Sequence, residues 1–388
     1  MRKGYAKMNR YYSTIVFITL AILVATVIHL FDNETLSQRV KKEFLSIACL
    51  IGIGCACEYL GIFFNGAPYI STTIHGIIKA VEFSIAPIIP VLYANIVGLK
   101  TKKTKKKIIL FSILIVNSIC ELISVYIPFI FYIDKDNVYR HSFFYGIYIF
   151  MYITGIGFFI FELIKYTKKY QSRNLITLIA IIGFLICGFS IRVFNAEVYT
   201  DWLVVAISLL LFIIYYSDLI LKVDPLTCLL NRKSYQNRIK KIDYATAIII
   251  LDANKFKEIN DHYGHQVGDK VLKIIAKTII EAYGKYAHCY RIGGDEFCII
   301  LKRGKLEAII QKEDNFDNYK MIEDLNNNFD ELLSNKIKDF PMLKNGVSKG
   351  YGIFYGTLDE FKNHSNPSET INEVIKQADD RMYNEKNK

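Results

Sequence analysis

Seven long apolar segments in the first 221 residues constrain the fold of this chain more than any other feature. A helix needs roughly 20 predominantly apolar residues to cross the hydrocarbon core of a bilayer, and each segment reaches that length. The segments are 12–31, 45–64, 76–98, 108–133, 143–166, 175–194 and 202–221. The sequence therefore predicts an all-α N-terminal transmembrane bundle of seven helices.

Composition agrees with a membrane protein that carries a soluble domain. The chain has 388 residues, of which 52% are hydrophobic, and its mean hydropathy of +0.23 is high for a soluble protein. Long apolar runs stop near Leu221, so we expect a transmembrane region over 1–221 and a soluble domain over 222–388. Much of the net charge of +11 lies in short loops, which indicates cytoplasmic loops rather than a nucleic-acid surface. No nucleic-acid partner is expected.

The distribution of Lys and Arg predicts the orientation in the lipid bilayer. Basic residues crowd the loops after the first, third and fifth segments, and six lysines lie between Lys100 and Lys107. By the positive-inside rule these loops and the C-terminal domain lie in the cytoplasm, with the N-terminus outside. Basic residues between Arg2 and Arg10 favour the opposite orientation, but that would put the six-lysine loop on the wrong face.

Polar residues interrupt several apolar segments, and a charge in hydrocarbon needs a partner or a cavity. They are Glu58, Lys79, Glu82, Asn117 and Glu121. Lys79 and Glu82 are three residues apart, so they can pair on one helix face. Pro87 and Pro90 should kink the same helix and open space beside it. The sequence leaves two interpretations open, a ligand pocket and a set of interhelical tethers.

Beyond Leu221 the pattern changes to that of an α/β domain. We predict helices over 227–242 and 269–283, strands over 245–251, 288–292, 297–301 and 347–354, a polar helical stretch before the last strand, and a final helix from about Glu369. The strands 288–292 and 297–301 are separated by Gly293 and Gly294, which predicts a β-hairpin.

The hairpin turn joins two glycines to two acids. Gly293 and Gly294 are expected to supply positive φ and close backbone approach, and Asp295 and Glu296 follow them directly. Asp252 stands at the end of the strand 245–251, where pairing with the hairpin would bring it beside these acids. Such carboxylates suit magnesium with phosphate oxygens completing its coordination. Taken alone, an acidic hairpin is more often a solvated turn.

Four blocks in order identify a family resemblance that covers roughly residue 224 to the end of the chain. They are Asp224–Arg232 (DPLTCLLNR), Asp252–Asp269 (DANKFKEINDHYGHQVGD), Gly293–Phe297 (GGDEF), and Lys376–Asp379 with Met382 and Tyr383. The chain resembles the GGDEF domain of diguanylate cyclases. This implies an α/β fold in which helices flank a central sheet, similar to that of nucleotide cyclases.

The resemblance implies a metal-dependent site. Asp252, Asp295 and Glu296 match catalytic and metal-binding positions, and the carbonyl of Ala253 matches a further metal ligand. Two Mg²⁺ ions per active site are implied, with Mn²⁺ as a possible substitute. Glu296 matches the group that helps to ionise the attacking 3′-hydroxyl, and the metals would stabilise charge on the transferred phosphate.

The resemblance also implies the substrate. Asn260 and Asp269 match the pair that holds guanine, Lys257 and Lys376 match phosphate-binding positions, and Gly293 and Gly294 match substrate-binding positions of the signature turn. Two GTP molecules would be joined into cyclic di-GMP and two pyrophosphates. Because each domain would contribute one GTP, the resemblance implies a homodimer.

Some positions depart from the family pattern. Cys228 stands where the opening block has glycine. Residues 284–287 (GKYA) replace the R-x-x-D site for product inhibition, so we predict weak or no inhibition by product through that site. The leading hypothesis is a bacterial, multi-pass inner-membrane diguanylate cyclase under control of a signal sensed in the membrane region. The alternative is a catalytically silent, GTP-binding regulatory module.

Overall fold

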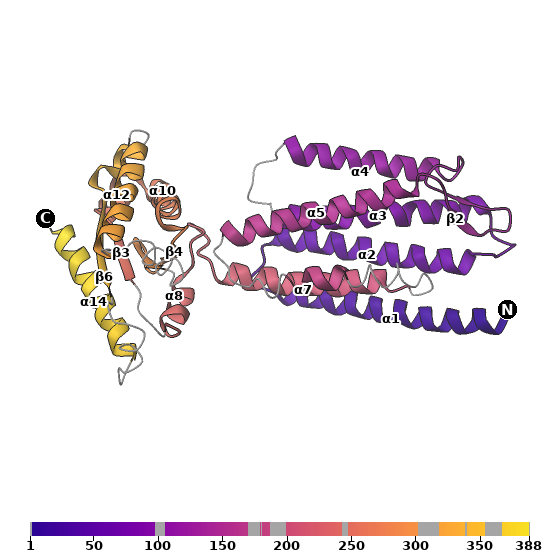
Figure 1. Ribbon diagram of the computed structural model, residues 1–388, viewed down its shortest axis with the longest axis horizontal. Coiled ribbons are helices and arrows are strands. Elements are labelled where there is room, and N and C mark those ends of the chain that lie inside the picture. The colour runs from indigo at the N-terminus through magenta and orange to yellow at the C-terminus, as the bar shows by residue number, and fades with distance from the viewer. Residues whose placement is uncertain are drawn as a thin grey trace. The chain divides into compact units, whose positions relative to one another are not determined.

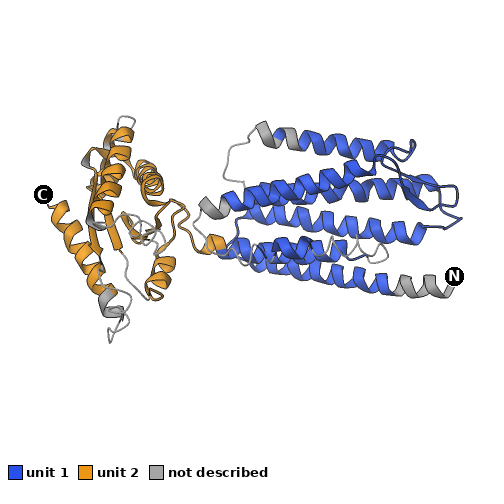
Figure 2. Ribbon diagram, viewed as in Figure 1, with its two compact units in different colours: residues 1–218 blue, residues 219–388 orange. Residues whose placement is uncertain are grey.

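The computed structural model describes residues 2–97, 105–169, 179, 181–186, 199–242, 247–301, 318–337, 340–353 and 367–387. The chain divides into two compact units, Met1–Asp218 and Leu219–Lys388 (Figure 2). The units are described separately below.

Unit 1 is a bundle of long helices (Figure 1). They are α1 (Arg2–Asp32), α2 (Gln38–Phe64), α3 (Thr72–Val97), α4 (Lys105–Ile123), α5 (Tyr145–Lys169) and α7 (Asp201–Leu221), whose last turn contains the unit boundary. Five of the described helices, α1, α2, α3, α5 and α7, are long and apolar enough to cross a membrane. The bundle predicted from the sequence is thus helical, while seven spans are not confirmed, because most of the predicted segment 175–194 lies outside the described residues.

The prediction of one helix over 108–133 is wrong. Helix α4 ends at Ile123, and a small hairpin of β1 (Phe131–Ile133) and β2 (Tyr139–His141) follows it. The Ser124 hydroxyl donates to the Cys120 carbonyl and accepts from the Ile130 amide at 2.9 Å. These bonds replace those of a continuing helix, and Pro128 cannot donate one. The apolar run is therefore divided between a helix and a turn leading into a strand.

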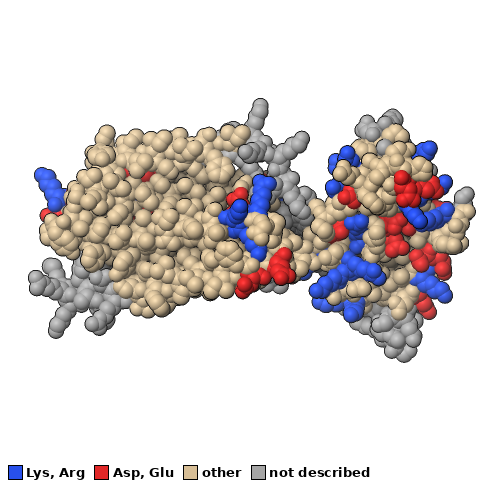
Figure 3. All heavy atoms as spheres, turned by 180° about the vertical axis from the view of Figure 1, so that it is seen from behind, with Lys and Arg blue, Asp and Glu red and all other residues tan. Residues whose placement is uncertain are grey.

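The outer surface of unit 1 is strongly apolar. Phe17, Phe150 and Phe161 are each more than 60% exposed, on α1 and α5. One face of the bundle shows a broad surface almost free of charged side chains, which gather towards its two ends (Figure 3). An exposed apolar belt of this extent is what a helical bundle presents to lipid.

Inside unit 1, polar side chains tie helices together. Lys79 and Glu82 pair at 2.8 Å within α3, as predicted, and both are buried. The Tyr12 hydroxyl of α1 donates to the Glu58 carboxylate of α2. A Cβ on Gly61 would lie 2.6 Å from Lys79 Cε, so this glycine makes room for the lysine. For these residues the contacts support the tether interpretation. Both Glu121 oxygens, in contrast, are buried and have no hydrogen-bond partner among the residues that the structure describes.

Unit 2 is built on a four-stranded antiparallel sheet with the order β4-β5-β3-β6. The strands are β3 (Ala247–Ala253), β4 (Ala287–Arg291), β5 (Glu296–Leu301) and β6 (Val347–Ile353). The helices are α8 (Arg232–Ile239), α9 (Phe256–Tyr263), α10 (His265–Tyr283), α12 (Asn318–Ile337) and α14 (Pro367–Lys386), with a 3₁₀ turn at Pro341–Asn345. The predicted α/β pattern is confirmed, although the helix expected over 227–242 begins only at Arg232.

Side chains of β3 point alternately to the two faces of the sheet, and each face carries its own hydrophobic core. Ile249 and Leu251 face the cluster formed with α10 and α12, whereas Ile248 and Ile250 face the cluster formed with α14. Side chains alternate across a strand, so a continuous apolar strand needs helices on both faces.

Helix α14 lies directly on the edge strand β6. A Cβ on Gly350 would lie 1.9 Å from the Ala378 carbonyl oxygen, and one on Gly352 would lie 2.0 Å from that of Val374. Both glycines are therefore required for this close approach. Their packing fixes where the last turn of α14 reaches the sheet.

Candidate active site

The acids of β3 and the hairpin meet at one end of the sheet. In the antiparallel ladder Asp252 stands opposite Glu296, and the amide of Ala253 donates to the carbonyl of Asp295 at 3.2 Å. Asp252 is only 5% exposed, while Glu296 is exposed at the start of β5. The structure thus places Asp252 beside the hairpin acids, as the strand pattern predicts.

The glycines of the turn act differently from our expectation. Neither Gly293 nor Gly294 has positive φ, so that part of the prediction is wrong. A Cβ on Gly293 would lie 2.4 Å from Glu296 Oε2, whereas no atom of the described residues lies within 4 Å of one on Gly294. Gly293 is needed because the Glu296 side chain folds back over it. The prediction of a close approach at this glycine is therefore confirmed.

Mutual repulsion marks the acidic end of the sheet. The pKa of Asp295 is raised, first by burial and then by the negative charge of Asp252. The pKa of Glu296 is raised by burial and by the charges of Asp252 and Asp295. Carboxylates that resist ionisation because of their neighbours are stabilised by an added cation.

A lysine that the sequence analysis missed occupies part of this site. Lys386, in the last turn of α14, donates to Asp252 Oδ1 at 2.6 Å. Its pKa is raised by that hydrogen bond, against a smaller opposing effect of burial. The sequence held part of the signal: Val374, Ala378 and Met382 are apolar at four-residue spacing, which puts Lys386 on the same helix face, but the sequence does not place that face against Asp252.

A second contact network, also missed, holds the hairpin to the start of unit 2. Arg291 donates to both Asp224 oxygens at 3.0 and 3.2 Å, and to the Gly294 carbonyl at 2.7 Å. Asp224 also accepts from the Thr227 amide and hydroxyl. Burial acts to raise the pKa of Asp224, but the hydrogen bonds from Thr227 and Arg291 outweigh it, so the pKa is lowered. The opening block thus braces the acidic turn.

Cys228 has positive φ, 62°, in the same opening segment. A left-handed backbone favours glycine, so the cysteine here carries backbone strain.

The predicted guanine-binding residues meet where α9 passes into α10. Gly264, with φ of 82°, separates the two helices. A Cβ on Gly268 would lie 2.0 Å from Asn260 Oδ1, so the Asn260 side chain packs over the first turn of α10. Asp269 is the next residue along and is exposed. Asn260 and Asp269 therefore lie at one helix junction.

The predicted phosphate-binding lysines are open to solvent. Lys257 on α9 and Lys376 on α14 are both exposed, and within the described part of the chain neither makes a hydrogen bond or ion pair. The structure does not bring either lysine into contact with the acids. Arg381 is engaged elsewhere, stacked over the Tyr351 ring and donating to its carbonyl at 2.9 Å.

The acids suit a divalent cation only in part. Within the described ranges, no three carboxylate, imidazole or thiol side chains are grouped closely enough to hold a metal ion. Magnesium typically takes one or two carboxylates and completes its shell with water and substrate phosphates. The hard oxygen donors and the repulsion between Asp252 and Asp295 fit that arrangement, with a substrate supplying further ligands.

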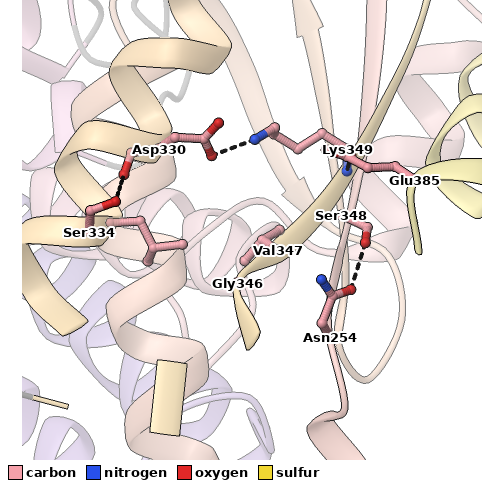
Figure 4. A pocket seen from close by; sticks show the side chains of 9 residues that line it. Asn254, Asp330, Ser334, Gly346, Val347, Ser348, Lys349 and Glu385 are labelled. Carbon is pink, nitrogen blue, oxygen red and sulfur yellow. Dashed lines mark hydrogen bonds and ion pairs between the residues drawn. The ribbon is translucent and has the colours of Figure 1, made fainter. Parts of the chain in front are cut away.

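A pocket of about 330 Å³ lies near this site, between α12, β6 and the end of α14 (Figure 4). Lys349 crosses it to the Asp330 carboxylate, and Ser348 donates to Asn254 Oδ1 at 2.6 Å. None of the predicted site residues lines it. Its charged groups are paired within the protein.

These features define an α/β domain with an acidic hairpin on an antiparallel sheet. Residues 221–388 match the family model for the diguanylate cyclase GGDEF domain, so this part of the chain is a GGDEF domain.

Curated relatives match part of the chain. The diguanylate cyclase DgcN of Escherichia coli (strain K12) is 39% identical over 95 residues, which are 23% of this chain and 23% of DgcN. The probable diguanylate cyclase DgcI of the same strain is 29% identical over 168 residues, 42% of this chain and 30% of DgcI. The chain thus spans less than a third of the length of either relative.

A solved structure also matches. That of the diguanylate cyclase SiaD from Pseudomonas aeruginosa, in complex with its activator SiaC, shows 21% identity and a TM-score of 0.31, covering 42% of this chain and 58% of SiaD.

Proposed function

We propose that this chain is a membrane-bound diguanylate cyclase that converts two GTP into cyclic di-GMP and two pyrophosphates. The observation that carries the proposal is the placement of Asp295 and Glu296 beside the buried Asp252, in a domain that matches the GGDEF family.

The chain's own groups have distinct roles in this proposal. Asp252 and Asp295, with Glu296 and the Ala253 carbonyl, would hold two Mg²⁺ ions, or Mn²⁺ in their place. When bound, the metals supply Lewis acidity to the phosphates and the attacking hydroxyl. Glu296 is exposed at the start of β5, so it is placed to accept the proton of the 3′-hydroxyl.

Substrate recognition would use the junction of α9 and α10. The Asp269 carboxylate can accept from the ring N–H and amino group of guanine, and Asn260 can add a further hydrogen bond. Lys257 and Lys376 are exposed and unpaired within the described residues, so they are available to phosphate oxygens. Gly293 and Gly294 would leave room for the phosphates at the turn.

Each new phosphodiester bond forms when the 3′-oxygen of one GTP attacks the α-phosphate of the other and pyrophosphate leaves. Each domain offers one such acidic edge, so two chains would face each other as a homodimer. The replacement of the product-binding motif at 284–287 supports weak inhibition by product.

The five apolar helices support insertion in the cytoplasmic membrane. The loop charges support a cytoplasmic GGDEF domain over 222–388 and an N-terminus outside. The membrane region over 1–221 would bind an unknown sensory ligand and shift the population of productive dimers.

The test is to incubate the full chain in lipid nanodiscs with GTP and Mg²⁺ and identify products by mass spectrometry. We expect cyclic di-GMP from the parent and none from the Asp295→Ala, Glu296→Ala double variant, with no corresponding product from ATP. GTP binding without product from the parent would support the silent regulatory module instead.

A further inference from the structure

The last turn of α14 places a cation on the most buried acid of the site. Lys386 Nζ lies 2.6 Å from Asp252 Oδ1. The Asp252 side chain is 7% exposed and the Lys386 side chain is 39% exposed. The carboxylate is therefore fixed inside the domain, while the lysine reaches it from the surface.

The position of Lys386 is built into the fold. Gly350 and Gly352 allow α14 to lie against β6, and the neighbouring Glu385 accepts a hydrogen bond from the backbone amide of Lys349 (Figure 4). Two adjacent side chains of one helical turn thus contact two neighbouring strands. The end of α14 is anchored at Glu385, and Lys386 is delivered to Asp252.

Lys386 supplies positive charge to the whole acidic edge. Asp252 stands opposite Glu296 in the antiparallel ladder, and the Ala253 amide donates to the Asp295 carbonyl, so the Lys386 ammonium group on Asp252 lies at the edge that carries all three acids. The ammonium group therefore does electrostatically what a bound cation would do.

We propose that Lys386 is an internal counter-ion that holds Asp252 in the metal-free protein and must leave it before a divalent cation binds there. The proposal rests on the proposed function, in which Asp252 is a metal ligand. Lys386 would then set the metal affinity of the site from a position outside the family signature pentapeptide.

A divalent cation at Asp252 should displace Lys386 rather than bind beside it. An ammonium group and a divalent cation repel each other, and Mg²⁺ needs close, nearly ideal octahedral contacts with its oxygen ligands. Lysine has a flexible four-carbon stem and a strongly hydrated head group, so a partly exposed lysine can turn into solvent. The Glu385 anchor would keep α14 in place while Lys386 moves.

The test measures metal binding rather than turnover. Full chain in nanodiscs is titrated with Mn²⁺ without nucleotide, and free Mn²⁺ is followed by electron paramagnetic resonance. Removing a hydrogen bond to a charged group should change the Mn²⁺ dissociation constant on the order of tenfold. We therefore expect Lys386→Met to bind Mn²⁺ about tenfold more tightly than the parent. Lys386→Arg, which keeps the positive charge, should stay near the parent affinity.

Lys277→Met is the matched control. Lys277 is exposed and pairs only loosely, at 3.8 Å, with Glu281 on the surface of α10, so this variant loses the same charge away from the acids. Its Mn²⁺ affinity should equal that of the parent. Circular dichroism checks that each variant is folded, and Lys386→Gln replaces Lys386→Met if the latter fails.

The possible outcomes separate the two proposals. Binding that requires Asp252 but is unchanged or weaker in Lys386→Met overturns the counter-ion role alone. Binding that is absent, or is unaffected by Asp252→Asn, also overturns the counter-ion role, whereas cyclic di-GMP formation in the assay with GTP and Mg²⁺ tests the cyclase proposal separately. Tighter binding in Lys386→Met that disappears in the Asp252→Asn background supports the proposal.

Discussion

At the residue scale, ionisation of Asp295 and Glu296 lowers the free energy of unfolding. A carboxyl whose pKa is raised in the folded state favours folding below its unfolded pKa, and this contribution is lost as the pH rises through the folded pKa. Both acids have raised pKa values, so at neutral pH their ionisation destabilises the metal-free domain. A cation that binds there should restore stability.

We therefore expect Mg²⁺ to raise the melting temperature of the full chain more at pH 7.5 than at acidic pH. The effect should fade as the pH falls into the carboxyl range, because protons then replace the metal. Scanning calorimetry with and without Mg²⁺ measures it, and Asp295→Asn, Glu296→Gln is the control that should lose most of the effect. An equal Mg²⁺ effect at all pH values would contradict this account.

Some residues of the site could be predicted from the sequence and others could not. The carboxylates of the acidic edge could be predicted, because the GGDEF motif is contiguous and Asp252 ends a strand. Lys386 could not be paired with Asp252 in advance, since 134 positions separate them and only the docking of α14 joins them. Cys228 shows the physical reason for a glycine in the opening block, because its φ is positive.

At the scale of elements, the hairpin after α4 is the main departure from the predicted structure. By hydropathy, 108–133 is one apolar segment. Hydropathy contains no information on the hydrogen bonds of the Ser124 hydroxyl to the backbone, which end the helix. The hairpin is then fixed by Asn137, which has φ of 60° and is 3% exposed. The side-chain Nδ2 of Asn137 donates to the Ala67 and Ile70 carbonyls at 2.8 and 3.1 Å, and its Oδ1 lies 3.0 Å from His75 Nδ1.

Substitutions at Asn137 should separate backbone strain from lost hydrogen bonds. Both variants lose the side-chain bonds, but Asn137→Gly also removes the Cβ that the parent and Asn137→Ala hold in a left-handed backbone, so the Ala variant should be less stable than the Gly variant by about 1–2 kcal/mol. We expect thermal stability in the order parent, Gly variant, Ala variant, measured by calorimetry in nanodiscs. Equal stability of the Gly and Ala variants would show that the turn does not hold this backbone conformation.

At the scale of the whole molecule, helical and α/β parts were predictable to different depths. The GGDEF domain follows from four ordered motifs and was predicted almost strand by strand. The membrane region follows from hydropathy alone, which gives helices but no pairing between them, and five spans are described where seven were predicted. Tethers such as Tyr12 to Glu58 depend on which helices are neighbours, and hydropathy carries no such information.

A homodimeric mechanism predicts how activity changes with surface density. Because each bond-forming step would need two domains, the specific activity of the full chain in liposomes should fall as the protein-to-lipid ratio is lowered. The rate of pyrophosphate release over a hundredfold range of ratios measures this. A specific activity that stays constant when each liposome holds a single chain would show that one chain is sufficient.

The central claim is that the acidic edge around Asp252 is the catalytic centre of a diguanylate cyclase. The most direct test is the initial rate of cyclic di-GMP formation by the full chain and by Asp252→Asn, with equal folded protein verified by circular dichroism. We predict a loss of at least about 100-fold, in line with removal of a group that stabilises charge in the transition state. A variant that keeps the parent rate would contradict the claim and move the chemistry away from this edge.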